Sequence, residues 1–240
     1  MSDPKVYQQP VRRAPTQTRA EVSREKILLA ARNAFATHGF EAANVRDIAA
    51  EVGVTHTLIR YHFGSKEELW KDVVRDMYAR LDRTLSLEAL GHIDLTTVEG
   101  MKTYLRHYIR YCAQSPEQSR IMISETVLGG ERLEWMIGFI RDSHKALIPV
   151  FRRLMKTGVL PEVWIVSLFY IVSTVSQMPF VLANTIRGLY GVDMTSEAAI
   201  NAHTDAVIAI LLREEPESRE TWPHLPDWTK RANPPAATKP

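Results

Sequence analysis

Apolar residues recur at helical spacing in the first third of the chain and predict four successive helices. The first helix begins at Ser23 and is ended by Gly39. Asn44, Thr55 and Ser65 each precede a further apolar run, and these residue types cap helix N-termini, so the next three helices are expected to begin there. Ser65 is followed three positions later by a glutamate, which is the pattern of a capping box. The apolar faces are formed by Ile27, Ala30, Ala31, Ala34, Phe35, Val45, Ile48, Ala49, Val52, Leu69, Val73, Met77 and Leu81.

The remainder of the chain keeps the helical period and shows no alternation typical of strands. The fold class is therefore predicted to be all-α. Pro149 is expected to kink the helix that contains it, because proline lacks the backbone donor. The expected helices run from Val98 to Gln114, Glu117 to Leu128, Glu131 to Thr157, Pro161 to Tyr190 and Ser196 to Arg213.

The two ends of the chain lack this periodicity. Residues 1–22 are rich in Pro, Gln, Arg and Thr and are predicted to form a flexible basic arm, which either follows a phosphate backbone or is only a solubilising tail. Residues 214–240 are predicted to be a Pro-rich, disordered tail, because six of the 13 prolines fall in the last 25 residues.

Composition limits the possible functions. The net charge of +2 does not by itself identify a nucleic-acid binder. Cys112 is the only cysteine, which excludes an internal disulfide framework and a multi-cysteine zinc site. The N-terminus has no apolar run of the secretory type, so a cytoplasmic location is expected. No G-x-S-x-G, Walker or H-E-x-x-H signature is present, so we expect no catalytic residues, no cofactor and no metal.

The segment from Val163 to Ile186 contains 24 residues without a charge, which is long enough to cross a bilayer. A helix buried in a core or between subunits gives the same pattern. Several Ser, Thr, Asn and Gln residues and Pro179 interrupt the segment, and polar groups without partners are costly in lipid. The pattern favours burial, and no membrane contact is expected.

Two short helices joined by Gly53-Val54 have the form of a helix-turn-helix. Ile59 and Phe63 lie one turn apart and are expected to anchor the second of these helices, which leaves its polar side chains pointing outward. The chain contains no acid from Thr55 to Lys66, so this surface suits phosphates and base edges. The candidate DNA-contacting residues are Arg46, Thr55, His56, Thr57, Arg60, Tyr61, His62 and Lys66.

These candidates have different expected roles. Arg60 carries a fork of donors and is favoured as a base or phosphate contact over a solvated surface residue. Arg46 and Lys66 lie in first helical turns, where the helix dipole favours phosphate. Tyr61 and His62 either contact DNA or cover the helix junction. His56 and His62, which have five residues between them, lack the further ligands that a zinc site needs.

The segment from Arg24 to Leu69 contains AARNAFATHGF, NVRDIAAEVGV and YHFGSKEEL, and it resembles the DNA-binding domain of TetR-type (TetR/AcrR) transcriptional regulators. The resemblance implies a homodimer that binds roughly palindromic, double-stranded operator DNA through the candidate residues above. It also implies that a small-molecule effector binds the C-terminal half. Arg60 stands where many relatives carry tyrosine, and Ala43-Asn44 where threonine often precedes the second helix, so the operator sequence cannot be taken from relatives.

The resemblance also suggests the domain organisation. The expected units are the basic arm (1–22), a TetR-type helix-turn-helix DNA-binding domain (23–82), a helical effector-binding and dimerisation domain (83–213) and the tail (214–240).

Aromatic and polar residues of the C-terminal half either form plain core or line an effector pocket. The expected effector is a mid-sized, largely apolar or aromatic molecule, with Arg141 as a further polar contact. A histidine in an apolar stripe, such as His144, is more often a core residue than a ligand contact. The candidate lining residues are Tyr104, His107, Tyr108, Tyr111, Trp135, Phe139, His144, Trp164, Phe169, Tyr170 and Gln177.

The last two helices are expected to pair with those of a second subunit, with Ile200, Ala206, Val207, Ile210 and Leu211 on one side. The predicted function is a transcriptional regulator, expected to be a repressor, whose effector shifts the conformational population and weakens DNA binding. Two alternatives stay open. One is a helical enzyme or carrier without an operator, and the other is a membrane-anchored regulator that uses the charge-free segment.

Overall fold

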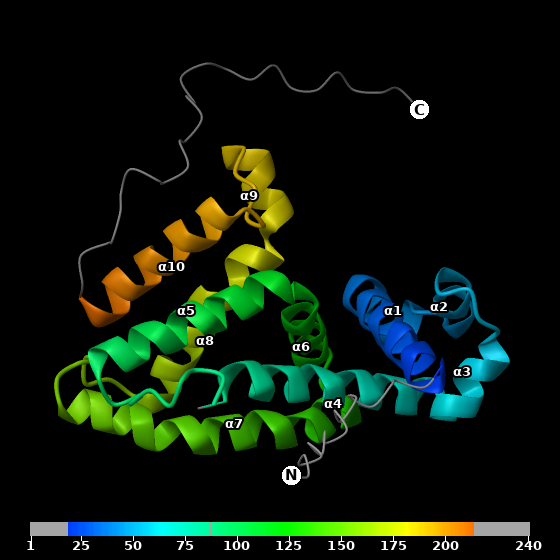
Figure 1. The fold of residues 1–240 in the computed structure, drawn as a ribbon, viewed down its shortest axis with the longest axis horizontal. Coiled ribbons are helices and arrows are strands. Elements are labelled where there is room, and N and C mark those ends of the chain that lie inside the picture. Colours follow the sequence, from blue (N-terminus) through cyan, green and yellow to red (C-terminus); the bar gives the residue numbers. More distant parts are fainter. Residues whose placement is uncertain (1–18, 87, 214–240) are drawn as a thin grey trace, which may run out of the picture.

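The computed structural model describes residues 19–86 and 88–213, which form ten helices and contain no strand (Figure 1). The predicted all-α fold class is confirmed. Helix α1 begins inside the segment expected to be a flexible arm, and the rest of that arm and the predicted tail lie outside the described residues. The helices are α1 (Arg19–Ala42), α2 (Val45–Glu51), α3 (His56–Phe63), α4 (Lys66–Leu85), α5 (Val98–Gln114), α6 (Pro116–Leu128), α7 (Glu131–Lys156), α8 (Ile165–Val181), α9 (Ala183–Tyr190) and α10 (Glu197–Leu212).

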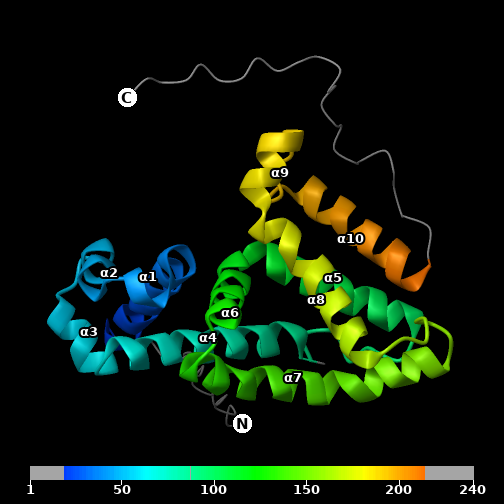
Figure 2. The same ribbon diagram turned by 180° about the vertical axis from the view of Figure 1, so that it is seen from behind.

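Helices α1–α3, which we call the N-terminal lobe, gather at one end of the long helix α4. Helices α5–α10 form the C-terminal lobe at the other end of α4, where α5 packs on α4 and α7 lies alongside it, and α9 and α10 lie farther from it (Figure 2). Helix α4 runs without interruption through the domain boundary that the sequence predicted between residues 82 and 83. The two lobes therefore share one continuous helix.

The three predicted caps in the N-terminal lobe are confirmed. Asn44 Oδ1 accepts from the Arg46 N–H at 2.9 Å, and Thr55 Oγ1 accepts from the Leu58 N–H at 3.3 Å. Ser65 Oγ accepts from the Glu68 N–H at 3.1 Å. The capping box is only half formed: the Ser65 N–H donates to the Phe63 carbonyl, and the Glu68 carboxylate lies 3.0 Å from Nζ of Lys71.

Gly39 interrupts α1, as predicted. Its backbone has φ 73° and ψ 172°, a conformation that glycine adopts without the cost that a Cβ adds. One further turn, residues 40–42, follows before the cap of α2. The chain therefore changes direction at a corner between α1 and α2.

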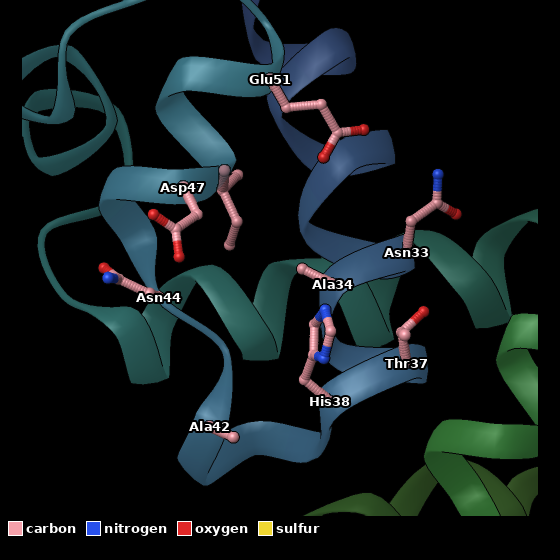
Figure 3. Close-up of a pocket in the computed structure, with 9 residues that line it drawn as sticks. Asn33, Ala34, Thr37, His38, Ala42, Asn44, Asp47 and Glu51 are labelled. Carbon is pink, nitrogen blue, oxygen red and sulfur yellow. The ribbon is translucent and has the colours of Figure 1, made fainter. Parts of the chain in front are cut away.

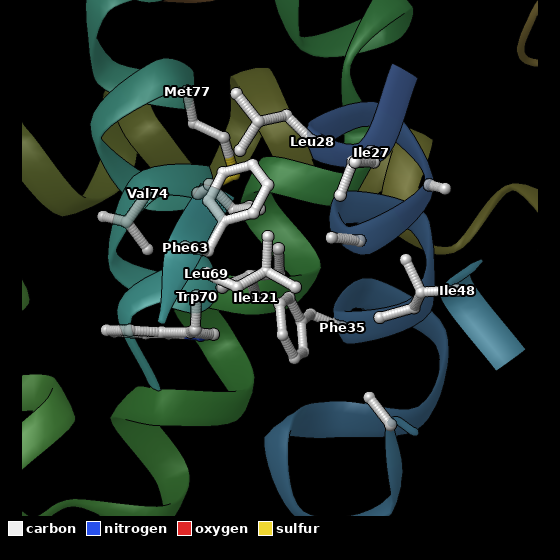
Figure 4. Packing of buried hydrophobic residues seen from close by; sticks show 14 of the residues in the cluster. Ile27, Leu28, Phe35, Ile48, Phe63, Leu69, Trp70, Val74, Met77 and Ile121 are labelled. Carbon is white, nitrogen blue, oxygen red and sulfur yellow. The ribbon is translucent and has the colours of Figure 1, made fainter. Parts of the chain in front are cut away.

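The first hydrophobic core joins the two lobes (Figure 4). Ile27 and Phe35 of α1 and Leu69 and Trp70 of α4 are buried together. Ile121 of α6 belongs to the same core, so α1 packs on both α4 and α6. Burial of apolar side chains contributes roughly 1.5–3 kcal/mol for each. Movement of α6 therefore bears directly on α1.

Two further cores hold the C-terminal lobe together. The second contains Tyr104 of α5, Phe151 of α7 and Phe169 of α8, and the third joins Ile109 of α5 to Ile200 of α10. Pro149 lies inside α7, which continues through it as one helix from Glu131 to Lys156.

The predicted single helix from Pro161 to Tyr190 is wrong. Helix α8 begins only at Ile165, and the chain bends by 66° at Leu182 into the separate helix α9. Pro179 lies three residues before the bend and withholds the donor that the Val175 carbonyl would otherwise receive. Among the described residues no single helix is long and apolar enough to cross a membrane, and the bent pair α8–α9 meets only the criteria of length and composition.

Candidate nucleic-acid interface and effector site

Two apolar side chains anchor helix α3 to the protein core. Ile59 is 2% exposed and Phe63 is 6% exposed, and both belong to the core shared with α1 and α4. The guanidinium of Arg24 in α1 lies 5.3 Å from the Phe63 ring centroid and is paired with Asp72 of α4 at 2.6 Å. The predicted anchoring of α3 is confirmed, and its opposite face is left free.

That opposite face carries polar and cationic groups. His56, Thr57 and Arg60 are exposed, and Tyr61 is 82% exposed. His62 is half-buried, with its ring 5.4 Å from that of Tyr61. Helix α3 contains no acidic residue. An acid-free helix face with a free guanidinium has the chemistry of a major-groove surface.

The other three candidates differ from one another in position. Arg46 is exposed in the first turn of α2, and Thr55 is committed to capping α3. Lys66 is half-buried: its ammonium donates to the Glu41 carbonyl at 3.0 Å and lies 4.7 Å from the Phe40 ring centroid. The structure thus gives Lys66 a position at the corner between α1 and α2, and its phosphate contact stays a prediction.

The lobes are also held together by charged side chains whose pairing no sequence pattern predicted. Arg32 of α1 is 7% exposed and lies 3.0 Å from the Glu117 carboxylate of α6. Arg132 of α7 contacts Glu41 next to α2. These partners are 85 and 91 residues apart in the chain, so no local spacing could have identified them.

The eleven candidate effector residues do not form one group. Five of them lie together where α5, α7 and α8 meet, and we call these five residues the sensor cluster. Stacking joins His144 to Phe169 at 4.1 Å and Tyr104 to Tyr108 at 6.0 Å between ring centroids. The sensor cluster consists of Tyr104, Tyr108, His144, Phe169 and Gln177.

A hydrogen-bonded chain runs through the sensor cluster. Gln177 donates from Nε2 to the Tyr108 hydroxyl at 2.5 Å and accepts at Oε1 from Ser119 Oγ at 2.8 Å. Burial raises the pKa of the Tyr108 hydroxyl well above its usual value and raises the pKa of the Cys112 thiol to about 12. Burial also lowers the pKa of His144. The polar groups at this position are therefore uncharged at neutral pH.

Three other candidates face the junction with α4. Trp135 lies 5.7 Å from Trp70 and Phe139 lies 5.1 Å from Tyr78, between ring centroids. The Tyr111 hydroxyl lies 3.2 Å from the Met77 carbonyl oxygen and 2.6 Å from Oε1 of Gln118. The last three are exposed: His107, Trp164 and Tyr170. The structure thus brings five of the eleven candidates together, and effector binding by any of them stays a prediction.

A cavity of about 290 Å³ lies in the N-terminal lobe, between α1 and α2 (Figure 3). Asn33, His38, Asp47 and Glu51 are among the residues that line it. None of the predicted effector residues takes part in this cavity. Among the described residues no group of three or more His, Cys, Asp and Glu is placed to hold a metal ion.

Helices α8 and α10 leave apolar side chains uncovered. Tyr170 is 62% exposed and Ile171 is 47% exposed on α8, and Ile210 is 78% exposed on α10. Ile200 and Val207, which the sequence placed on the same side as Ile210, are instead buried within the chain's own third core. A helix packed between other helices can be apolar on more than one side, which explains why spacing alone misassigned them.

The fold and the exposed face of α3 define an all-helical protein with an N-terminal helix-turn-helix. The family description "Bacterial regulatory proteins, tetR family" matches residues 27–73, and "Tetracyclin repressor-like, C-terminal domain" matches residues 98–211. The chain belongs to the TetR family.

Individual relatives resemble the chain over different lengths. The HTH-type transcriptional repressor AcnR of Corynebacterium efficiens is 37% identical over 82 residues, 34% of this chain and 44% of that protein. The chain thus matches less than half the length of this relative. The HTH-type transcriptional regulator RutR of Escherichia coli K12 is 26% identical over 200 residues, 81% of this chain and 92% of that protein.

Solved structures share the fold. A linker-substituted mutant of HlyIIR has a TM-score of 0.59 at 21% identity, covering 82% of this chain and 99% of that one. AibR, in a complex with isovaleryl coenzyme A and operator DNA, has a TM-score of 0.58 at 17% identity, covering 79% and 98% of the respective chains.

Proposed function

We propose that this protein is a sequence-specific DNA-binding transcriptional regulator that acts in the cytoplasm as a homodimer, and that it is a repressor and not an enzyme. The observation that carries the proposal is the α3 surface: a helix anchored by Ile59 and Phe63 that presents Arg60 and Tyr61 outward with no acid beside them. Membership of a family of regulatory proteins supports the same function.

DNA contact is assigned to two helices. Arg60, His56, Thr57 and Tyr61 are the contacts from α3, since they are exposed on the face opposite its anchors. Arg46 contacts phosphate from the first turn of α2, where its guanidinium is exposed and the helix dipole favours an anion. Arginine is expected to bind guanine bidentately, so Arg60 is the residue on which sequence preference depends most.

Dimerisation uses the exposed apolar side chains of α8 and α10, Tyr170, Ile171 and Ile210. Exposed apolar patches of this kind mark protein interfaces. A two-fold dimer presents two copies of α3 to successive major grooves, so the operator is roughly palindromic.

The effector is a small, uncharged and largely apolar molecule that binds at the sensor cluster. Its aromatic rings provide apolar contact, and Tyr108 and Gln177 offer hydroxyl and amide groups for orientation. Because the polar groups there are held uncharged by burial, a charged ligand would lose hydration without gaining a charged partner. Effector and operator then weaken each other's binding reciprocally.

The test is selection of preferred sequences from a random DNA library by the full chain, followed by titration in rising salt. We expect a palindromic consensus sequence. We also expect the logarithm of the binding constant to fall with the logarithm of the salt concentration, with a slope of roughly −0.9 for each phosphate contact. Binding that shows no sequence preference over competitor DNA would contradict the proposal and favour a helical carrier.

A further inference from the structure

Arg132 in the first turn of α7 bridges the two lobes. Its Nε lies 2.9 Å from Oε2 of Glu125 at the end of α6, and its Nη1 lies 3.3 Å from Oε1 of Glu41 in the last turn of α1. Its guanidinium carbon lies 4.0 Å from the centroid of the Phe40 ring. We call Phe40, Glu41, Glu125 and Arg132 the clasp.

The two ends of the clasp differ in strength. The Glu125 side chain is 2% exposed, so removing its cation would leave a buried charge uncompensated. The Glu41 side chain is 78% exposed, and ion pairs at that exposure contribute little and are screened by salt. Arg132 is therefore bound more firmly to the C-terminal lobe than to the N-terminal lobe.

The turn between α6 and α7 keeps the buried pair together. Gly129 and Gly130 form it, and both have positive φ, 70° and 87°. Glu125 and Arg132 thus belong to successive helices joined by a connection of two residues. When the α6–α7 turn moves, Arg132 moves with it.

The weaker end of the clasp, at Phe40 and Glu41, lies at the corner between α1 and α2, which positions the helix-turn-helix. Phe40 and Glu41 follow the break at Gly39 and lie just before the cap of α2. Lys66, the first residue of α4, holds the same corner by donating to the Glu41 carbonyl and lying over Phe40. A shift of Arg132 therefore acts where α1, α2 and α4 meet.

We propose that Arg132 is a positioning residue through which the C-terminal lobe sets the placement of α2 and α3. The buried pair with Glu125 makes Arg132 follow α6 and α7, and its contacts with Phe40 and Glu41 transmit that movement to the helix-turn-helix. Its role in operator binding rests on the proposed function. Its effect on the placement of the lobes does not.

The test uses two variants of the full chain. Glu41→Gln removes the exposed charge and leaves the Phe40 ring in place. The double variant Arg132→Met with Glu125→Gln removes the cation without leaving a buried charge. The matched control is Arg110→Met with Glu197→Gln, which removes an ion pair of 2.7 Å between α5 and α10, away from the clasp.

The first measurement is the distance between spin labels on E51C of α2 and K145C of α7, in a C112S background and diluted with unlabelled protein. The wild-type protein should give a narrow distribution of label distances and the control pair should match it. The double variant should give a shifted or broader distribution, and Glu41→Gln a smaller change in the same direction, because its ion pair is exposed. An unchanged distribution in the double variant, with normal helical content, overturns the proposal. If the double variant does not fold, Glu41→Gln provides the test, because Glu41 is exposed and its replacement is expected to leave the fold intact. An unchanged distance distribution for Glu41→Gln would then overturn the proposal.

The second measurement is affinity for the selected operator and for random DNA. The double variant should lose about fivefold or more in operator affinity, and Glu41→Gln should lose less, because its ion pair is exposed; both should keep their affinity for random DNA, since the DNA-contacting side chains are intact. Operator affinity equal to that of the control would overturn the role in operator binding. A wild-type protein that selects no DNA sequence would contradict the proposed function. The distances between the spin labels would still show whether Arg132 sets the placement of α2.

Discussion

His203 of α10 donates from Nε2 to the carbonyl oxygen of Val175 in α8 at 2.8 Å, replacing the backbone donor that Pro179 lacks. This bond ties α10 to α8 just before the bend at Leu182. Without the imidazole this partly buried carbonyl would lose its donor, and an acceptor left without a donor away from water is costly. The bond thus couples the break in the charge-free segment to the packing of the last helix.

Replacement of His203 by phenylalanine should lower the free energy of unfolding by about 1–3 kcal/mol, because the Val175 carbonyl loses its donor. In a Pro179→Ala background the same replacement should cost less, since an alanine at that position supplies a helical N–H. Denaturant unfolding of the four proteins measures the coupling. Equal losses in both backgrounds would show that the imidazole has no special relation to Pro179.

Stability should also depend on pH through His203. Burial lowers the pKa of this imidazole below its usual 6.5, so the folded state binds fewer protons than the unfolded state in the window just below pH 6.5. The stabilisation is present above pH 6.5 and is lost as pH falls through the folded-state pKa. His144, whose pKa burial also lowers, contributes in the same direction. Unfolding between pH 5 and 7.5 should therefore show a shallower slope for His203→Phe than for wild type, and an identical slope would contradict the assignment.

Two glycines in helices should respond oppositely to alanine. A Cβ at Gly100 in the first turn of α5 would overlap the backbone carbonyl of Asp94, whereas nothing lies within 4 Å of a Cβ at Gly138 in α7. Gly138→Ala should raise the free energy of unfolding by up to about 1 kcal/mol. Gly100→Ala should lower it by about 1–3 kcal/mol, since the start of α5 has to shift. Thermal unfolding of the two variants checks the signs, and a stabilised Gly100→Ala protein would contradict the described start of α5.

The proposed dimer should be sensitive to a charge on α8. Tyr170→Glu places a carboxylate within the proposed interface and should raise the dimer dissociation constant by more than about tenfold. Val127→Glu on α6 is the matched control, since Val127 is 79% exposed and lies outside that interface. Sedimentation of both variants measures the effect. A Tyr170→Glu protein that stays as dimeric as the control would remove this face from the interface.

The local architecture of the N-terminal lobe could be predicted because its signals are local. Asn44, Thr55 and Ser65 cap the helices that follow them, and their bonds are made within three residues. Ile59 and Phe63 lie one turn apart and could therefore be assigned to the core from spacing alone.

The C-terminal lobe could be predicted less well, since its key relationships are not local. The bend after Pro179 could not be predicted from the sequence, because a proline within a helix does not by itself show where the helix bends. The group that satisfies the freed Val175 carbonyl is His203 from α10, which is distant in sequence. The inward direction of Ile200 depends on packing that the apolar pattern of α10 does not specify. Arg132 and Glu41 are 91 residues apart, and nothing in their sequence context indicates their contact.

Hydroxyl-radical footprinting on the selected operator tests the central claim most directly. The wild-type dimer should protect two half-sites centred about one helical turn, or a multiple of it, apart. Arg60→Ala should lose this footprint while remaining a folded dimer, whereas the control Arg152→Ala, an exposed arginine of α7, should keep it. An Arg60→Ala footprint identical to that of wild type would contradict the account of α3 as the helix that recognises the operator.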